Sequence, residues 1–121
     1  MRFLMLRSGD LPRDGDPNRA FDEAMCAYED DLRAAGVLLA AESLEPRRTG
    51  TRLRFDCPGA PSILESPFDR PTNDVGGFYI LQLRSWAEAI EWGRRCPLDL
   101  ALVDGEQAVL DIRAIDDGPG R

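Results

Sequence analysis

The stretch GGFYILQLRSWAE, residues 76–88, decides the fold of this chain. Within it, residues 78–83 form an almost unbroken apolar run, which predicts a largely buried β-strand. Ser85 follows, and Glu88 stands three residues after it, the capping-box pattern that begins a helix. Pro97 is expected to end that helix, because proline cannot continue its hydrogen-bond ladder. A buried strand that leads into a capped helix indicates a mixed α and β protein.

The segments on either side supply the other elements. The predicted order is a strand at 3–6, a helix from Asp16-Pro17 to Gly36, strands at 37–41, 51–57, 62–64 and 78–83, the helix from Ser85 to Pro97, and a strand at 109–115. This β-α-β-β-(β)-β-α-β order predicts a ferredoxin-like α+β domain over residues 1–115, with two helices on one face of an antiparallel sheet. Residues 116–121 are predicted to be a polar tail.

The second face of the predicted sheet is also apolar. Phe78 and Ile80 alternate with Tyr79, Leu81 and Leu83, so both sides of this strand carry apolar side chains. Helices can cover only one of the two faces in this topology, and a bare apolar face of this size usually meets a partner. We therefore expect a homodimer in which two sheets face each other as a dimeric α+β barrel.

Composition excludes several classes of function. The chain of 121 residues has a formal net charge of −7 and a pI near 4.5, which disfavours nucleic acid and anionic membranes as partners. All 15 basic residues are Arg, so a lysine Schiff base is excluded, and with no His there is no imidazole zinc site or Ser-His-Asp triad. No carboxylate cluster suggests a metal, and no metal or other cofactor is expected.

The cysteines and the N-terminus predict a cytoplasmic protein. Cys26, Cys57 and Cys96 are odd in number and widely spaced, which favours reduced thiols over a disulfide framework. They are interpreted as packed thiols, because none has an evident activating base. The first apolar run is too short for a signal peptide or a membrane span.

Without histidine, proton transfer near neutral pH falls to a carboxylate, a thiol or a phenol. Glu42, which ends the apolar strand 37–41, is the predicted base, because partial burial would raise its pKa. The alternative is a solvated strand end that pairs with an arginine. Tyr79 could offer its phenol to an oxyanion, or it could be an ordinary core residue.

A long polar loop and one strand supply the other candidates. Glu65 and Asp69 flank Pro67-Phe68 and could place a carboxylate at the edge of a lid over the site, with Asp69 as a catalytic residue; the alternative is a plain polar connection. Arg52 and Arg54 share one strand face and could hold a substrate carboxylate or phosphate, or simply be solvated. Glu65, Phe68 and the two arginines are the predicted substrate-binding residues.

Several motifs together resemble one family. Glu42-x-Leu44-x-Pro46, Gly76-Gly77-Phe78-Tyr79 and the helix from Trp86 to Pro97 resemble the YCII-related proteins, in particular the DGPF-type subgroup. The resemblance implies a ferredoxin-like fold and a dimeric barrel. It also implies links to the breakdown of aromatic compounds in some relatives and to alternative sigma factors in others. The signature itself reads Glu65-Ser66-Pro67-Phe68 here, and a family histidine aligns with Met25, so the proposed catalytic dyad of the wider group does not carry over.

Two functional hypotheses follow. The first is a cofactor-free enzyme that isomerises, cyclises, dehydrates or hydrolyses an aromatic or polyketide-like compound by carboxylate acid–base chemistry, with Glu42 as base and Arg54 or Tyr79 stabilising negative charge. The second is a non-catalytic dimer that binds a ligand or a protein, linked to transcription regulation.

Overall fold

The computed structural model describes residues 1–9, 19–44, 50–65 and 75–118. The elements are β1 (Arg2–Gly9), α1 (Arg19–Ala34), β2 (Leu38–Ser43), β3 (Thr51–Arg54), β4 (Ser62–Glu65), β5 (Val75–Gln82), α2 (Trp86–Arg94), the short 3-10 helix η3 (Leu98–Ala101) and β6 (Ala108–Ala114). The order of helices and strands along the described chain is the predicted one. The proposed helix start at Asp16-Pro17 lies outside the described residues.

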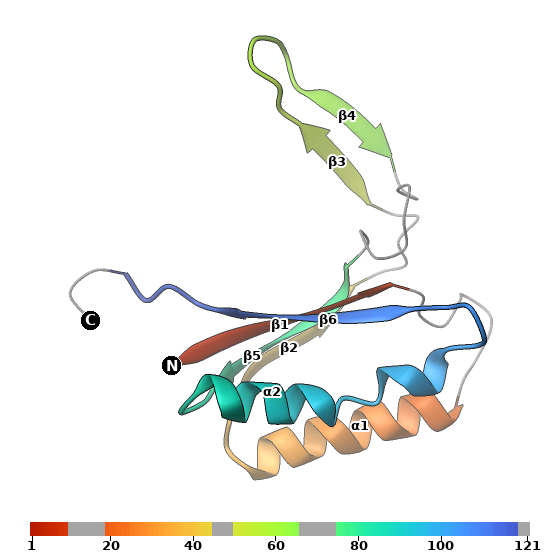
Figure 1. Ribbon diagram of the computed structural model, residues 1–121, viewed down its shortest axis with the longest axis vertical. Coiled ribbons are helices and arrows are strands. Elements are labelled where there is room, and N and C mark those ends of the chain that lie inside the picture. Colours follow the sequence, from red (N-terminus) through yellow and green to blue (C-terminus); the bar gives the residue numbers. More distant parts are fainter. Residues whose placement is uncertain (10–18, 45–49, 66–74, 119–121) are drawn as a thin grey trace.

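Four strands form one antiparallel sheet in the order β2-β5-β1-β6. Both long helices lie on the same side of this sheet (Figure 1). The ferredoxin-like α+β architecture is therefore confirmed. The two strands with the most buried residues, β1 and β5, occupy the middle of the sheet, where both of their edges are paired.

The predicted strands at 51–57 and 62–64 do not join this sheet. They form a separate two-stranded hairpin, β3–β4, in which Thr51 pairs with Glu65 and Arg54 with Ser62. The hairpin projects from one end of the main sheet (Figure 1). Period two in a sequence identifies a strand and its two faces, but it does not specify which strand is the neighbour.

The core lies between the helices and the sheet. Its buried side chains recur along α1 at three- and four-residue spacing and alternate along β1 and β5. The largest fully buried side chains are Phe3, Met5, Leu32 and Leu81. The helix cap at Ser85 forms as predicted, because the Ser85 hydroxyl accepts a hydrogen bond from the Glu88 amide at 3.1 Å. The Glu88 carboxylate accepts from the backbone amide of Arg84, at 3.1 Å, and not from that of Ser85 as in a complete capping box.

The opposite face of the sheet is apolar near its centre. Leu4 and Leu6 on β1 and Phe78 and Ile80 on β5 alternate with the core residues and are only half-buried. The predicted alternation along β5 is thus confirmed.

Within the described segments, no helix combines the length and apolar character needed to cross a membrane.

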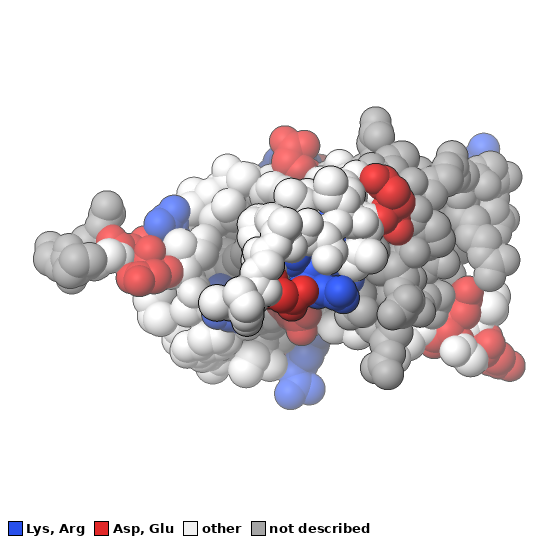
Figure 2. All heavy atoms as spheres, turned by 90° about the horizontal axis from the view of Figure 1, so that it is seen from above, with Lys and Arg blue, Asp and Glu red and all other residues white. Residues whose placement is uncertain are grey.

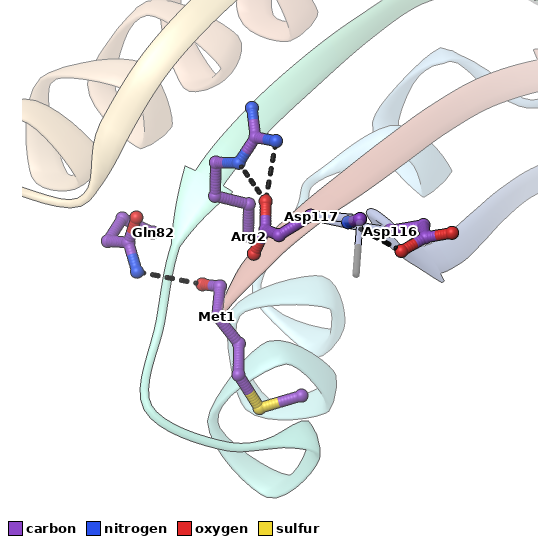
Figure 3. A network of polar contacts seen from close by, with 6 residues as sticks. Met1, Arg2, Gln82, Asp116 and Asp117 are labelled. Atoms are coloured by element: carbon purple, nitrogen blue, oxygen red, sulfur yellow. Dashed lines mark hydrogen bonds and ion pairs between the residues drawn. The ribbon is translucent and has the colours of Figure 1, made fainter. Parts of the chain in front are cut away.

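Polar contacts tie the two ends of the described chain together (Figure 3). Arg2 donates to Asp117 through Nε at 2.9 Å and Nη2 at 2.6 Å, while Gln82 donates to the Met1 carbonyl at 3.2 Å. The backbone amide of Ile115 also donates to the Arg2 carbonyl at 2.9 Å. The start of the predicted polar tail is therefore fixed against the first strand.

Candidate functional site

The two residues predicted for proton transfer lie on opposite faces of the sheet. Glu42 pairs with Phe78 in the β2–β5 ladder and is exposed on the face that the helices leave open. Tyr79, one residue further along β5, is 2% exposed and points to the helices. The partial burial predicted for Glu42 is wrong, because it stands near the end of an edge strand. One subunit does not bring these two side chains together.

The predicted substrate-binding residues fall on the hairpin or outside the described structure. Arg52, Arg54 and Glu65 lie on β3 and β4, away from the core, and Arg54 forms an exposed ion pair with Asp56 at 3.5 Å. Seen from above, charged side chains stand beside a mostly uncharged hairpin tip (Figure 2). Phe68 and Asp69 lie outside the described residues, as does the proposed lid.

A different set of polar side chains meets inside the helix–sheet layer. Arg7 on β1 lies beside Gly77 on β5, which in turn pairs with Ser43 on β2. The Arg7 side chain crosses Gly77 and donates from Nη2 to the Ser43 hydroxyl at 2.5 Å. A Cβ at position 77 would stand 2.5 Å from Nε and 2.7 Å from Cζ of Arg7, so glycine is required for this crossing.

Tyr79 connects strand β5 to helix α1. Its phenol donates to Oε2 of Glu29 at 3.3 Å, and Oε1 of Glu29 lies 3.7 Å from Nη2 of Arg33, one turn along the helix. Burial raises the pKa of Tyr79 well above its ordinary value, and the negative charge of Glu29 adds to this effect, while the positive charge of Arg7 opposes it. The phenol therefore remains a neutral donor, and Glu29 remains the acceptor.

A second tyrosine closes the core side of this site. Tyr28 meets Tyr79 edge to face with ring centroids 5.8 Å apart, and its hydroxyl donates to the Trp92 carbonyl at 2.8 Å. Burial is the main cause that raises the pKa of Tyr28. The Trp92 ring in turn carries the Arg95 guanidinium at 4.2 Å. The rings of Tyr79, Tyr28 and Trp92 thus pack in a row beside these polar side chains.

Cys96 is the one cysteine that packs against the core. Burial raises its pKa to about 11, the positive charge of Arg7 lowers it, and the negative charges of Glu29 and Asp99 raise it. The thiol is therefore protonated at neutral pH and unsuited to nucleophilic attack. Cys26 and Cys57 are exposed, so their predicted packing is wrong: one lies on the outer side of α1 and the other at the hairpin turn.

Thiol labelling should separate these cysteines. We expect Cys26 and Cys57 to react rapidly with an aromatic disulfide reagent at pH 8 in the native protein, and Cys96 to react only after unfolding. The measurement is the absorbance of the released thiol, before and after addition of denaturant. A Cys96→Ser variant should give the same native count, whereas native labelling of three thiols at similar rates would contradict the burial of Cys96.

We call Arg7, Glu29, Ser43, Tyr79 and Cys96 the polar cluster. Met25, where the family histidine aligned, is a buried core residue. Among the described residues, no group of three or more cysteines and carboxylates is arranged to hold a metal ion. The cluster instead combines a carboxylate, a phenol and a guanidinium, which are groups for proton transfer and anion binding.

Sequence reasoning found Tyr79 but missed Arg7, Glu29 and Ser43. Arg7 looks like the charged end of a short strand, and Glu29 is one of several acidic residues on α1. Two signals were nevertheless present: Arg7 keeps the inward alternation of Phe3 and Met5, and Gly77 interrupts an otherwise apolar strand. Together these features indicate a large side chain that crosses a glycine.

A family model described as the YCII-related domain matches residues 1–114, which is nearly the whole chain. No curated protein sequence matches the chain significantly.

Proposed function

We infer that this chain, which belongs to the YCII-related domain family across residues 1–114, is a cofactor-independent enzyme that transfers a proton on a small molecule. The observation that carries the proposal is the hydrogen bond from the buried Tyr79 phenol to the Glu29 carboxylate. The pair places a carboxylate base, with a defined orientation, at the boundary between an apolar core and solvent. Glu29 replaces Glu42 as the favoured base.

The reaction needs only the groups of the chain itself. Glu29 takes a proton from a carbon or hydroxyl of the substrate and becomes neutral, while Tyr79 holds the carboxyl group in place. The same proton then returns to a different atom of the substrate, which gives isomerisation, or to a leaving hydroxyl, which gives dehydration. Aromatic side chains beside the cluster, Tyr28 and Trp92, favour an aromatic or polyketide-like substrate.

Replacing a glutamate by glutamine, which has an amide in place of the carboxylate, tests which residue is the base. The wild-type protein, mixed with small ketones and carboxylic acids in D2O, is expected to accelerate hydrogen–deuterium exchange at one carbon, followed by proton NMR. Glu29→Gln should slow this exchange by roughly 10²- to 10⁴-fold, the usual contribution of a general base. Glu42→Gln provides the matched comparison, because Glu42 is an exposed carboxylate on the other face.

The two variants have opposite meanings. Loss of exchange in Glu29→Gln alone supports the polar cluster. Loss in Glu42→Gln alone would reject it and favour a site on the open face. Circular dichroism of both variants should match that of the wild type, since Glu29 is on a helix surface with a side chain 27% exposed.

The same proposal includes a homodimer in the form of an α+β barrel. It is supported by the half-buried Leu4, Leu6, Phe78 and Ile80 on the sheet face opposite the helices. In this dimer the projecting β3–β4 hairpin contacts the partner. We further assign the chain to the DGPF-type subgroup, on the motifs around Glu42 and Gly76-Gly77. The free cysteines support the cytoplasm as its compartment.

A binding function without catalysis is the second candidate. The hairpin supports it, because Leu53, Phe55 and Ile63 are all exposed and Phe55 keeps 74% of its accessible surface. Exposed apolar residues on a projecting hairpin are typical of a protein contact site. A protein that binds ligands but accelerates no proton exchange would favour this candidate, with a role beside transcription regulation.

A further inference from the structure

We propose that the guanidinium of Arg7 binds the carboxylate of a small organic acid. This inference rests on the proposed function, because it names the substrate class of the same site. The carboxylate would lie at the end of the sheet where Arg7 meets Ser43, within the polar cluster that also contains Glu29 and Tyr79. The substrate is accordingly an acid, and its reacting carbon lies on the Glu29 side of its carboxylate.

The first argument is the unbalanced hydrogen bonding of Arg7. The residue is 9% exposed, yet within the described part of the chain its guanidinium has a single hydrogen bond, from Nη2 to Ser43, and its buried Nε has no partner. No carboxylate in the described part of the chain forms an ion pair with it. Arginine does not lose its proton in proteins, and a buried charge is normally paired. A bound oxyanion would supply the missing acceptor.

The second argument is the way the strands hold this side chain. Gly77 has no Cβ, so the guanidinium of Arg7 lies directly against the backbone of β5. Ser43 is exposed, and it belongs to β2, which is an edge strand of the sheet. The arginine therefore extends from the buried interior to an edge that solvent reaches. The Ser43 oxygen accepts from Arg7, which leaves the Ser43 hydroxyl hydrogen to donate to the same anion.

The charges near the site favour a carboxylate over a phosphate. The cluster contains one guanidinium, that of Arg7, together with the negative carboxylate of Glu29, and the chain as a whole has a net charge of −7. A phosphate dianion usually requires several cationic or amide donors. One guanidinium with one hydroxyl matches a planar monoanion. The nearby Tyr28 and Tyr79 rings make an aromatic acid a suitable probe.

Nitrogen-15 NMR can observe the proposed contact directly. The probe is sodium benzoate, with benzamide as the neutral analogue of the same shape, and the signal is the Arg7 Nε–H resonance, assigned by its absence in Arg7→Met. We expect benzoate to shift this resonance saturably in a titration that extends past ~1 mM, and benzamide to leave it in place. Inorganic phosphate should bind more weakly than benzoate.

The variants then separate charge from packing. Arg7→Met should weaken benzoate binding by roughly 10- to 100-fold, the usual effect of removing a charged hydrogen-bond donor, and Ser43→Ala should weaken it less. Arg113→Met is the matched control, because Arg113 is an exposed arginine on β6 that pairs with Leu4 on the opposite face. It should bind benzoate like the wild type.

Three results would overturn the proposal. They are no saturable benzoate shift in the wild type, an equal shift with benzamide, and unchanged benzoate binding in Arg7→Met. If Arg7→Met does not fold, the comparison of benzoate with benzamide in the wild-type protein decides.

The carboxylate site and the general base can be rejected independently, because Glu29→Gln should still bind benzoate. Glu29-dependent exchange without benzoate binding rejects only the carboxylate site. Benzoate binding with Glu29-independent exchange rejects only the base.

Discussion

Substitution of Gly77 by alanine is expected to lower the free energy of unfolding by about 1–3 kcal/mol, the range for overpacking a buried site. The added Cβ would overlap the guanidinium of Arg7, which then has to leave Ser43. Displacing it removes the hydrogen bond of a buried charged group. Because Arg7 is only 9% exposed, moving its side chain also disturbs the packing around it.

The same substitution should have the opposite sign when Arg7 is absent. In an Arg7→Ala background the nearest atoms that Gly77→Ala would meet are gone, and alanine costs less chain entropy than glycine in a strand. The second substitution should then stabilise that background by up to roughly 1 kcal/mol.

Denaturant unfolding of the four proteins in this double-mutant cycle measures the coupling. Gly105→Ala supplies a comparison at a glycine with open space around it, although its positive φ of 88° carries its own strain. If Gly77→Ala costs the same with and without Arg7, the arginine does not lie against this glycine.

Alkaline pH is expected to destabilise the protein steeply. Both tyrosines of the chain, Tyr28 and Tyr79, have pKa values raised above the ordinary value of 10.0, mainly by burial. When the pKa of a phenol is higher in the folded state than in the unfolded state, the phenol contributes its full stabilisation below the unfolded-state pKa. This contribution is lost as the pH rises toward the folded-state pKa. Above pH ~10 each tyrosine should therefore remove about 1.4 kcal/mol of unfolding free energy per pH unit.

Cys96 begins this loss at lower pH. Burial raises its pKa from 9.0 to about 11, so its contribution decreases between these two values and adds to the tyrosine effect above pH 10. Absorbance at 295 nm should show little phenolate in the folded protein until it unfolds, and circular dichroism should change in the same narrow pH interval.

Single substitutions assign the effect. Tyr79→Phe should remove about half of the tyrosine contribution to the pH slope, and Cys96→Ser should remove the loss that starts near 9.0. A native protein that shows normal phenol titration at pH 10, with its secondary structure intact, would contradict the burial of both rings.

The sequence predicted the fold well where each feature was local. The apolar run of β5, the Ser85 cap and the α1 stripe each appear within a few residues, so their periods could be read directly. The separate β3–β4 hairpin could not, because strand partners are chosen over long distances. The exposure of Glu42 was missed for a related reason: it depends on β2 being an edge strand.

The polar cluster was harder to predict than the fold. It joins Arg7, Glu29, Ser43 and Tyr79 from four different elements, and each residue type is common on strand ends and helix surfaces. Only the sheet order β2-β5-β1 places Ser43, Gly77 and Arg7 in one row. The local pattern of residues does not indicate which strands are neighbours in the sheet. The inward alternation of β1 indicates only that the Arg7 side chain points to the core.

The position of β1 has a consequence for the making of the protein. This strand is synthesised before the other described elements, yet its two partners are β5 and β6, whose residues begin at Val75 and Ala108. Both edges of β1 therefore remain unpaired until most of the chain has been translated. Folding must close long loops before the central ladder gains any stability, which slows it. Synthesis that stops before residue 108 would yield a chain in which the central strand β1 keeps one open edge.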